Sequence, residues 1–244
     1  MTSIEENIRL VRERIRAAAE SVGREESEIM LLGASKMNDA AACREAIRCG
    51  IDALGENRVQ EMTEKWRENA YGGAPLHFIG HLQRNKVKQV VGRVSLIESV
   101  GSLPLLYEIE KEAEKQGLCQ DILLECNLGG EEQKSGFSEQ ALFPAAETAA
   151  ALSHIRVRGL MTVPPVAVDP QDSIPYFEKL RCLYVDIGEK LYDNHFVYLS
   201  MGMSGDFEQA IRCGATLVRV GSAIFGRRLY PEKNNEGDFR HESD

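Results

Sequence analysis

The sequence lacks a long apolar run, and it also lacks an excess of basic residues. Its 244 residues carry a formal net charge of -9, which repels nucleic-acid backbones and anionic lipid surfaces. No apolar stretch approaches the roughly 20 residues that cross a bilayer. The first residues, Thr2 to Glu6, have neither the basic nor the apolar part of a signal peptide. We therefore expect a cytoplasmic protein that binds neither nucleic acid nor membranes.

Cysteine pairs at metal-ligand or redox spacing are missing as well. No C-x-x-C pair or Cys/His cluster occurs among the six cysteines, which are Cys43, Cys49, Cys119, Cys126, Cys182 and Cys213. We expect no metal site, and we expect reduced, mostly buried thiols. No Pro/Gly/Ser-rich linker divides the chain, so we predict one domain over residues 1–230 and a polar tail at 231–244.

What the sequence does contain is an alternation of two kinds of segment. Short runs rich in Val, Ile and Leu alternate with longer charged segments of helical periodicity, which is typical of βα units around a parallel sheet. Ser3 and Glu6 form a capping-box pattern before an additional helix at the N-terminus. The sequence therefore predicts a single (β/α)₈ TIM barrel with an extra N-terminal helix. Its predicted strands are residues 29–35, 53–57, 76–81, 95–100, 121–127, 157–163, 196–200 and 217–221.

Helix-start residues and one short repeat support this division into units. Predicted N-caps are Asn38, Ser102, Ser138 and Ser204. The pentapeptide Ala-Ile-Arg-Cys-Gly occurs at residues 46–50 and again at 210–214, and in both copies the glycine stands where a helix would end before a strand. Chance and shared helix chemistry explain the identity equally well, so the repeat is used only to phase the units.

In barrels of this kind the C-terminal ends of the strands face the active site. Lys36 stands at such an end, where partial burial would lower the pKa of its amine and favour imine formation with an aldehyde or ketone. Taken alone, a lysine there is more often a solvated surface residue. Asn57 and His81 are likewise more often satisfied strand-end groups. The full set of strand-end residues is Lys36, Asn57, His81, Ser99, Asn127, Thr162, Ser200, Gly221 and Ser222.

Two turns of small residues follow the seventh and eighth predicted strands, at residues 200–206 and at Gly221–Ser222. Barrels often bind phosphate at these places, although ordinary tight turns have the same composition. Arg219 lies inside the eighth apolar run, where a buried guanidinium needs a partner. It could pair with Glu56 or Glu125, or it could face an acceptor on a ligand, and the spacing leaves both open.

These residues resemble the pyridoxal phosphate homeostasis proteins, also called pyridoxal phosphate-binding proteins, over nearly the whole chain. Around the lysine that family usually reads Val-Ser-Lys-Thr, whereas here Ala34 precedes the Ser-Lys pair and Met37 follows it, so this chain has no threonine hydroxyl at that position. The matching segments are residues 35–36, 55–61, 77–86, 134–137, 158–161, 199–204 and 219–222.

The resemblance implies pyridoxal 5′-phosphate (PLP) bound as an internal aldimine on Lys36, in a barrel like that of the fold-type III alanine racemases. It implies that Ser200, Gly221 and Ser222 hold the phosphate. It also implies that Arg219 faces the pyridine nitrogen and that Asn57 lies near the phenolic oxygen. A guanidinium cannot accept a proton, so the ring nitrogen would stay unprotonated and the cofactor would be a weak electron sink.

Three functions compete at this point. The first is a monomeric protein that binds, buffers and delivers PLP to the apo-forms of PLP enzymes, without robust catalysis. The second is a PLP-dependent racemase or lyase that uses Lys36 and either His81 or Tyr198 as proton carriers. The third is a Schiff-base aldolase without a cofactor, which rests on Lys36 and the phosphate-type turns alone. The absence of an evident second catalytic group favours the first.

Overall fold

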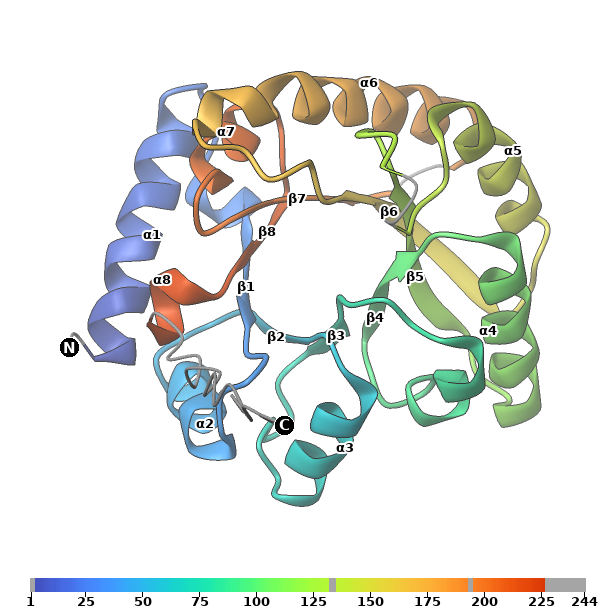
Figure 1. Ribbon diagram of the computed structural model, residues 1–244, viewed down its shortest axis with the longest axis horizontal. Coiled ribbons are helices and arrows are strands. Elements are labelled where there is room, and N and C mark those ends of the chain that lie inside the picture. The colour runs from blue at the N-terminus through green and yellow to red at the C-terminus, as the bar shows by residue number, and fades with distance from the viewer. Residues whose placement is uncertain (1–2, 132–134, 193–194, 227–244) are drawn as a thin grey trace, which may run out of the picture.

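Eight parallel strands close into a barrel in the computed structural model, which describes residues 3–131, 135–192 and 195–226 (Figure 1). Each strand pairs with its neighbours in sequence, and β8 pairs with β1 to complete the ring. This confirms the predicted TIM barrel, while the predicted tail at 231–244 lies outside the described residues. The strands are β1 Met30–Ala34, β2 Ala53–Glu56, β3 Leu76–Phe78, β4 Leu96–Val100, β5 Gln120–Cys126, β6 Ile155–Thr162, β7 Tyr198–Met203 and β8 Leu217–Val220.

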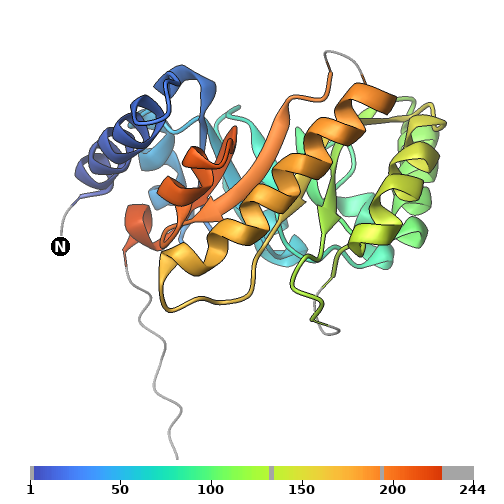
Figure 2. The same ribbon diagram turned by 90° about the horizontal axis from the view of Figure 1, so that it is seen from above.

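Helices surround the barrel on its outside, as Figures 1 and 2 show from two directions. The predicted extra N-terminal helix is α1, which contacts α7 and α8 outside the seam between β8 and β1. One connection departs from the predicted alternation, because β3 and β4 are joined by a 3₁₀ helix, Arg84–Gln89. The α-helices are α1 Ile4–Glu20, α2 Ala40–Arg48, α3 Val59–Arg67, α4 Leu103–Gln116, α5 Glu139–Ala150, α6 Ile174–Leu191, α7 Phe207–Arg212 and α8 Ser222–Phe225.

The helix starts agree with the predicted caps in part. The side chain that caps α2 is that of Asp39, so the prediction of Asn38 was wrong by one residue. Ser204 does not cap α7, which is preceded by Asp206. Both copies of the repeated pentapeptide end a helix and precede a strand, as the phasing required. The confirmed N-caps are Ser3, Ser102 and Ser138.

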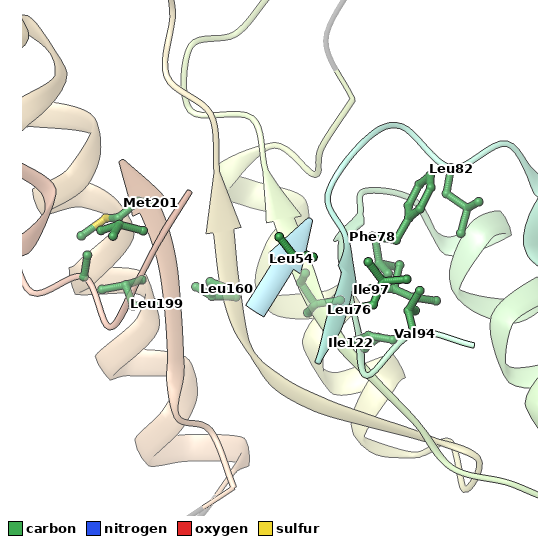
Figure 3. Close-up of a cluster of buried hydrophobic side chains, with 14 of the residues drawn as sticks. Leu54, Leu76, Phe78, Leu82, Val94, Ile97, Ile122, Leu160, Leu199 and Met201 are labelled. Atoms are coloured by element: carbon green, nitrogen blue, oxygen red, sulfur yellow. The ribbon is translucent and has the colours of Figure 1, made fainter. Parts of the chain in front are cut away.

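Two apolar clusters hold the fold together, because successive side chains of a strand point to opposite faces. Leu31 faces the larger cluster between the strands and the helices, and Leu32 faces the barrel interior. Figure 3 shows part of the larger cluster, where Leu76, Phe78 and Ile97 of neighbouring strands pack together. The buried apolar members of the interior are Leu32, Ala34, Ala53, Leu96, Leu123, Met161 and Leu217.

The cysteines form no disulfide. Cys43, Cys126 and Cys213 are buried, whereas Cys119 and Cys182 are exposed, so the expectation of mostly buried thiols holds for only part of the set. Among the described helices, none combines the length and the apolar composition needed to cross a bilayer.

Candidate functional site at the barrel mouth

Lys36 lies in a tight turn directly after β1, at the C-terminal end of the barrel, which is called the mouth below. Its side chain is half-buried, and the preceding Ser35 is fully buried. Met37 adopts a left-handed backbone with φ 64°, a conformation that residues other than glycine rarely take. The amide of Met37 donates a hydrogen bond to the carboxylate of Glu61, which holds this turn. The backbone that carries Lys36 is therefore fixed from α3.

A buried ion cluster supports the same turn from the outer side of the barrel. Lys65 of α3 is only 5% exposed. Its Nζ donates to the carbonyl oxygen of Ser35 at 2.8 Å, to Glu56 Oε1 at 2.7 Å and to Glu61 Oε1 at 2.8 Å. Burial lowers the pKa of Lys65, but the adjacent Glu56 carboxylate outweighs it, so the pKa is raised and the ammonium is retained. Lys65 was not among the residues predicted from the sequence, where its only signal is the spacing of four residues from Glu61.

Ser204 joins the turns that follow β7 and β8. Its Oγ accepts hydrogen bonds from the amide of Gly221 at 3.1 Å and from the amide of Ala223 at 3.4 Å. Asp206 fixes the β7 turn because its carboxylate accepts from the amide of Met203 at 2.7 Å. A hydroxyl and backbone amides, the kinds of donor that bind anions, therefore gather beside the end of β8, where the amides of Gly221 and Ala223 bind the Ser204 oxygen.

Arg219 lies inside the barrel and is 5% exposed. Its NH1 group donates to Ser200 Oγ, and its NH2 group donates to the carbonyl oxygen of Thr162 at 2.8 Å. Glu98 Oε2 lies 3.9 Å from NH1, and Glu98 Oε1 lies 2.7 Å from Nδ1 of His77. Burial acts to raise the pKa of Glu98, but His77 and Arg219 outweigh it, so the pKa is lowered and the carboxylate stays charged.

Neither of the two carboxylates proposed from the sequence pairs directly with Arg219. Glu56 binds Lys65 on the outer side of the barrel, and Glu125 interacts with the charge of Arg219 without forming an ion pair with it among the described residues. Glu98 is the carboxylate that lies near the guanidinium. The sequence signal for it was a single charged residue inside the otherwise apolar run of β4.

Ser200 is not at a strand end, contrary to the prediction. β7 continues to Met203, so Ser200 lies within the strand and is fully buried. Its hydroxyl donates to Glu98 Oε2 at 2.6 Å and accepts from Arg219. The boundary was misjudged because Ser-Met-Gly-Met reads as a loop in sequence. The serine at the turn itself is Ser204.

Asn57 and His81 lie at the mouth as predicted, in different surroundings. Asn57 is half-buried, and its Oδ1 has no hydrogen-bond partner in the described part of the chain. Gly80 packs directly against it, since a Cβ at Gly80 would lie 2.3 Å from the carbonyl oxygen of Asn57. His81 is exposed. A buried amide oxygen without a partner is rare and accepts a hydrogen bond from a ligand or from water.

Glu125 faces the barrel interior near the end of β5 and is 8% exposed. Its Oε2 accepts a hydrogen bond from Ser135 Oγ at 2.9 Å. Burial raises the pKa of this carboxyl, and Ser135, Arg219 and His81 only partly oppose the shift. The sequence named Glu125 only as a partner for Arg219, so its place at the mouth is a finding of the structure.

The other three strand-end residues bind neighbouring backbone. Ser99 Oγ donates to the carbonyl oxygen of Gly80, and Thr162 Oγ1 donates to that of Cys126 at 2.8 Å. The side-chain amide of Asn127 donates to the carbonyl oxygen of Glu131 at 2.9 Å. The first two contacts join the ends of adjacent strands, β3 to β4 and β5 to β6, and the third lies within the segment that follows β5.

A surface hollow of about 1040 Å³ lies at the opposite end of the barrel, where the strands begin. Its arginines are paired, with Arg12 2.7 Å from Asp52 and Arg16 2.9 Å from Glu26. Tyr198, the first residue of β7, lines this hollow. It therefore lies far from the mouth, which contradicts its suggested role as a proton carrier there.

The groups at the mouth suit a small anionic aldehyde better than a metal ion. The described residues contain no cluster of His, Cys, Asp or Glu that could hold a metal. They do supply the amine of Lys36, a guanidinium, the amides and hydroxyl at Gly221 and Ser204, and the free acceptor on Asn57. This donor set fits the aldehyde, phosphate and ring polar atoms of PLP. Lys134, which the resemblance included, lies outside the described residues.

Comparison with known proteins identifies the family. Residues 2–229 match the family model described as alanine racemase, N-terminal domain. The pyridoxal phosphate homeostasis protein of Aquifex aeolicus is 45% identical over 225 residues, covering 92% of this chain and 98% of the relative, and that of Escherichia coli is 37% identical, covering 96% and 100%. PipY of Synechococcus elongatus, solved with PLP bound, superposes with a TM-score of 0.77 at 29% identity, covering 88% of this chain and 100% of PipY. The chain therefore belongs to the pyridoxal phosphate homeostasis protein family, within the alanine racemase N-terminal domain family.

Proposed function

We propose that this chain binds PLP at the mouth as a Schiff base on Lys36 and that it binds, buffers and delivers the cofactor inside the cell. The observation that carries the proposal is that the amine and the anion-binding turn lie on neighbouring strands. β8 pairs with β1, and a Cβ added to Gly221 would lie 3.3 Å from the carbonyl oxygen of Ala34. The name of the relatives and the PLP-bound PipY structure support it.

Each polar part of the cofactor has a matching group in this arrangement. Gly221, Ser222 and the hydroxyl of Ser204 would hold the phosphate. Ser204 replaces Ser200 in this role, because the Ser200 hydroxyl is already bonded to Glu98 and Arg219. Arg219 would face the ring nitrogen and Asn57 the phenolic oxygen.

The arginine limits what the site can do with the cofactor. PLP supplies an aldehyde that captures amines and a ring that withdraws electrons. Arg219 is anchored by Thr162 and Ser200 and has no lone pair to accept a proton, so it keeps the ring nitrogen unprotonated. Electron withdrawal is then weak, which suits a protein that holds the cofactor and passes it on to apo-enzymes.

Borohydride reduction tests the assignment directly. Protein purified with PLP should absorb visible light and lose this band on reduction, with the stable adduct mapped to Lys36 by peptide mass spectrometry. Lys36→Ala should give no adduct while retaining the wild-type circular dichroism spectrum, and Lys115→Ala, at an exposed lysine, should behave as wild type. An unmodified Lys36 in reduced protein would reject the proposal. A Schiff base formed with a keto substrate and no cofactor would favour the aldolase instead.

A racemase or lyase is the second candidate, and Glu125 is the observation that favours it. Such reactions need an acid–base group besides Lys36, and Glu125 is a buried carboxyl at the mouth. Deuterium exchange at the α-carbon of a panel of amino acids decides between the two. Rapid exchange would establish an enzyme, and its absence removes the proton-abstraction step that racemases and lyases share.

A further inference from the structure

Two buried carboxyl groups project into the barrel, and their surroundings differ. Glu98 on β4 is fully buried between His77 and Arg219, and its Oε2 accepts a hydrogen bond from the Ser200 hydroxyl. Among the described residues, Glu125 on β5 has one hydrogen-bond partner, the Ser135 hydroxyl, which donates to its Oε2. When two carboxyl groups differ in this way, the paired one serves as a fixed counter-ion and the less paired one is the group that can donate a proton.

The position of Glu125 is fixed by backbone contacts as well as by Ser135. The amide of Phe137 donates to the carbonyl oxygen of Glu125 at 2.8 Å, and the amide of Asn127 donates to that of Phe137 at 2.9 Å. Gly101 leaves room for the side chain, since a Cβ there would lie 3.2 Å from Glu125 Oε2. The carboxyl group is therefore held in one place instead of moving freely.

The barrel topology places this group opposite Lys36. Strands β1 and β5 are separated by four steps in either direction around the closed ring of eight strands. Glu125 faces the interior because it lies two residues beyond Leu123, an interior residue of the same strand. A ligand bonded to Lys36 and held by the turns of β7 and β8 thus has Glu125 on the far wall of the mouth.

The geometry points to Glu125 as the acid–base group that speeds attachment of PLP to Lys36 and its release, an inference that rests on the proposed function. In attachment, the Lys36 amine would add to the aldehyde carbon and pass one proton to the aldehyde oxygen. The Glu125 carboxyl would then protonate this hydroxyl group, which leaves as water, and the resulting carboxylate would take the second proton from the nitrogen. In release, water would add to the carbon and the same transfers would run in reverse, so that the carbon–nitrogen bond breaks and the Lys36 amine and the Glu125 carboxyl are both restored. No oxidant or other reactant is consumed.

The surroundings of Glu125 raise the pKa of its carboxyl group and so favour the protonated form. The basic groups that face it are Arg219 on β8 and His81 after β3, and burial outweighs both, so the pKa of the carboxyl is raised. A carboxyl with a raised pKa is a better proton donor at neutral pH than an exposed one, and a placed acid of this kind contributes about 10²–10⁴-fold in rate.

The test compares the rates of PLP attachment and release with the dissociation constant of PLP. Apo-protein is mixed with PLP in a stopped-flow instrument to measure attachment, and loaded protein is diluted into a scavenging amine to measure release, from pH 5 to 9. Glu125→Gln should slow both rates at least about tenfold with an unchanged dissociation constant, because an acid–base group accelerates both directions equally. Glu125→Asp should restore part of the rate, and Glu114→Gln, at an exposed site on α4, should match wild type.

The outcomes separate this inference from the proposed function. Equal rates in wild type and Glu125→Gln, with an adduct still formed on Lys36, reject the role of Glu125 alone. A loss of affinity that accounts for the whole change in rate also rejects it, because it indicates a binding role. If the wild-type protein forms no adduct on Lys36, the proposed function fails and this inference fails with it.

Discussion

The two ends of the barrel differ in how their polar groups are satisfied. At the end where the strands begin, arginines are matched by carboxylates, as in the pairs Arg12–Asp52 and Arg16–Glu26. At the mouth, Asn57 Oδ1 has no partner among the described residues, and Glu125 is bonded through one oxygen only. Proteins pair nearly all their buried polar groups, and in the described part of the chain the unpaired side-chain atoms at the two ends differ: at the mouth it is an acceptor, Asn57 Oδ1, directly after the strand next to that of Lys36, whereas at the other end it is Arg158 Nε, on a guanidinium whose NH1 lies 3.6 Å from Asp121.

The largest expected effect on the free energy of unfolding comes from the buried ion cluster around Lys65, which supports the turn that carries Lys36. Lys65→Met removes the cation shared by two buried acceptors, the Ser35 carbonyl and Glu56, and by the partly buried Glu61, and breaking a buried pair costs about 3–5 kcal/mol. Arg12→Met at the other end removes a partly exposed pair, which costs about 1 kcal/mol or less. Urea unfolding of the two apo-proteins measures both. Equal losses would show that the mouth is not the more tightly coupled end.

The two interior carboxyl groups should respond to pH in opposite directions. The lowered pKa of Glu98 stabilises the fold above the pKa of the unfolded chain, and this contribution is lost as pH falls through the folded value. The raised pKa of Glu125 stabilises the fold below the unfolded pKa, and its contribution is lost as pH rises through the folded value. Between pH 4 and 7, Glu98→Gln should lose roughly 2 kcal/mol relative to wild type, whereas Glu125→Gln should become relatively more stable. Parallel pH curves for the two variants contradict this assignment.

Two serine substitutions test which hydroxyl group contributes to PLP binding at the mouth. Ser204→Ala removes the hydroxyl beside the amide of Gly221 and should weaken PLP binding by about tenfold to a hundredfold, since a hydrogen bond to a charged group contributes roughly 1.5–3 kcal/mol. Ser200→Ala should have the smaller effect, because this hydroxyl acts only through Arg219 and Glu98. Absorbance titration with PLP measures both. A larger effect at Ser200 would restore the role that the sequence predicted for it.

The smallest expected effect on PLP binding comes from a substitution at the opposite end of the barrel. Tyr198→Phe removes a hydroxyl that lies near the hollow, on a ring 5.7 Å from the guanidinium carbon of Arg158. The PLP dissociation constant and the visible spectrum should remain those of wild type. A shifted cofactor band in this variant would mean that the two ends are coupled through β7.

The barrel itself could be predicted from the sequence because its signals are local. Each strand is a short apolar run, and serine caps such as Ser102 and Ser138 mark helix starts. The end of β7 could not be placed in this way. Ser200 and Ser204 both stand among methionines and glycines, and only the pairing of β7 with β8, which extends to Met203, shows which serine is inside the strand.

Site residues could be predicted where their position depends on a single strand. Contacts between residues of different strands could not be predicted. Lys36, Asn57 and Gly221 lie at the mouth because each follows the end of its own strand. The contact of Glu98 with Arg219 depends on the alignment of β4 with β8 across the barrel. Sequence patterns carry no information on such a cross-barrel distance, so a charged residue in an apolar run indicates burial without naming the partner.

The closing seam between β8 and β1 has a consequence for the synthesis of the protein. Lys36 leaves the ribosome on the first strand, whereas Arg219 and Gly221 leave it on the last. A prematurely terminated chain therefore carries the lysine without the groups that would stand beside it. Only a chain translated through β8 can assemble the complete mouth, so truncated products would not compete with finished molecules for the ligand.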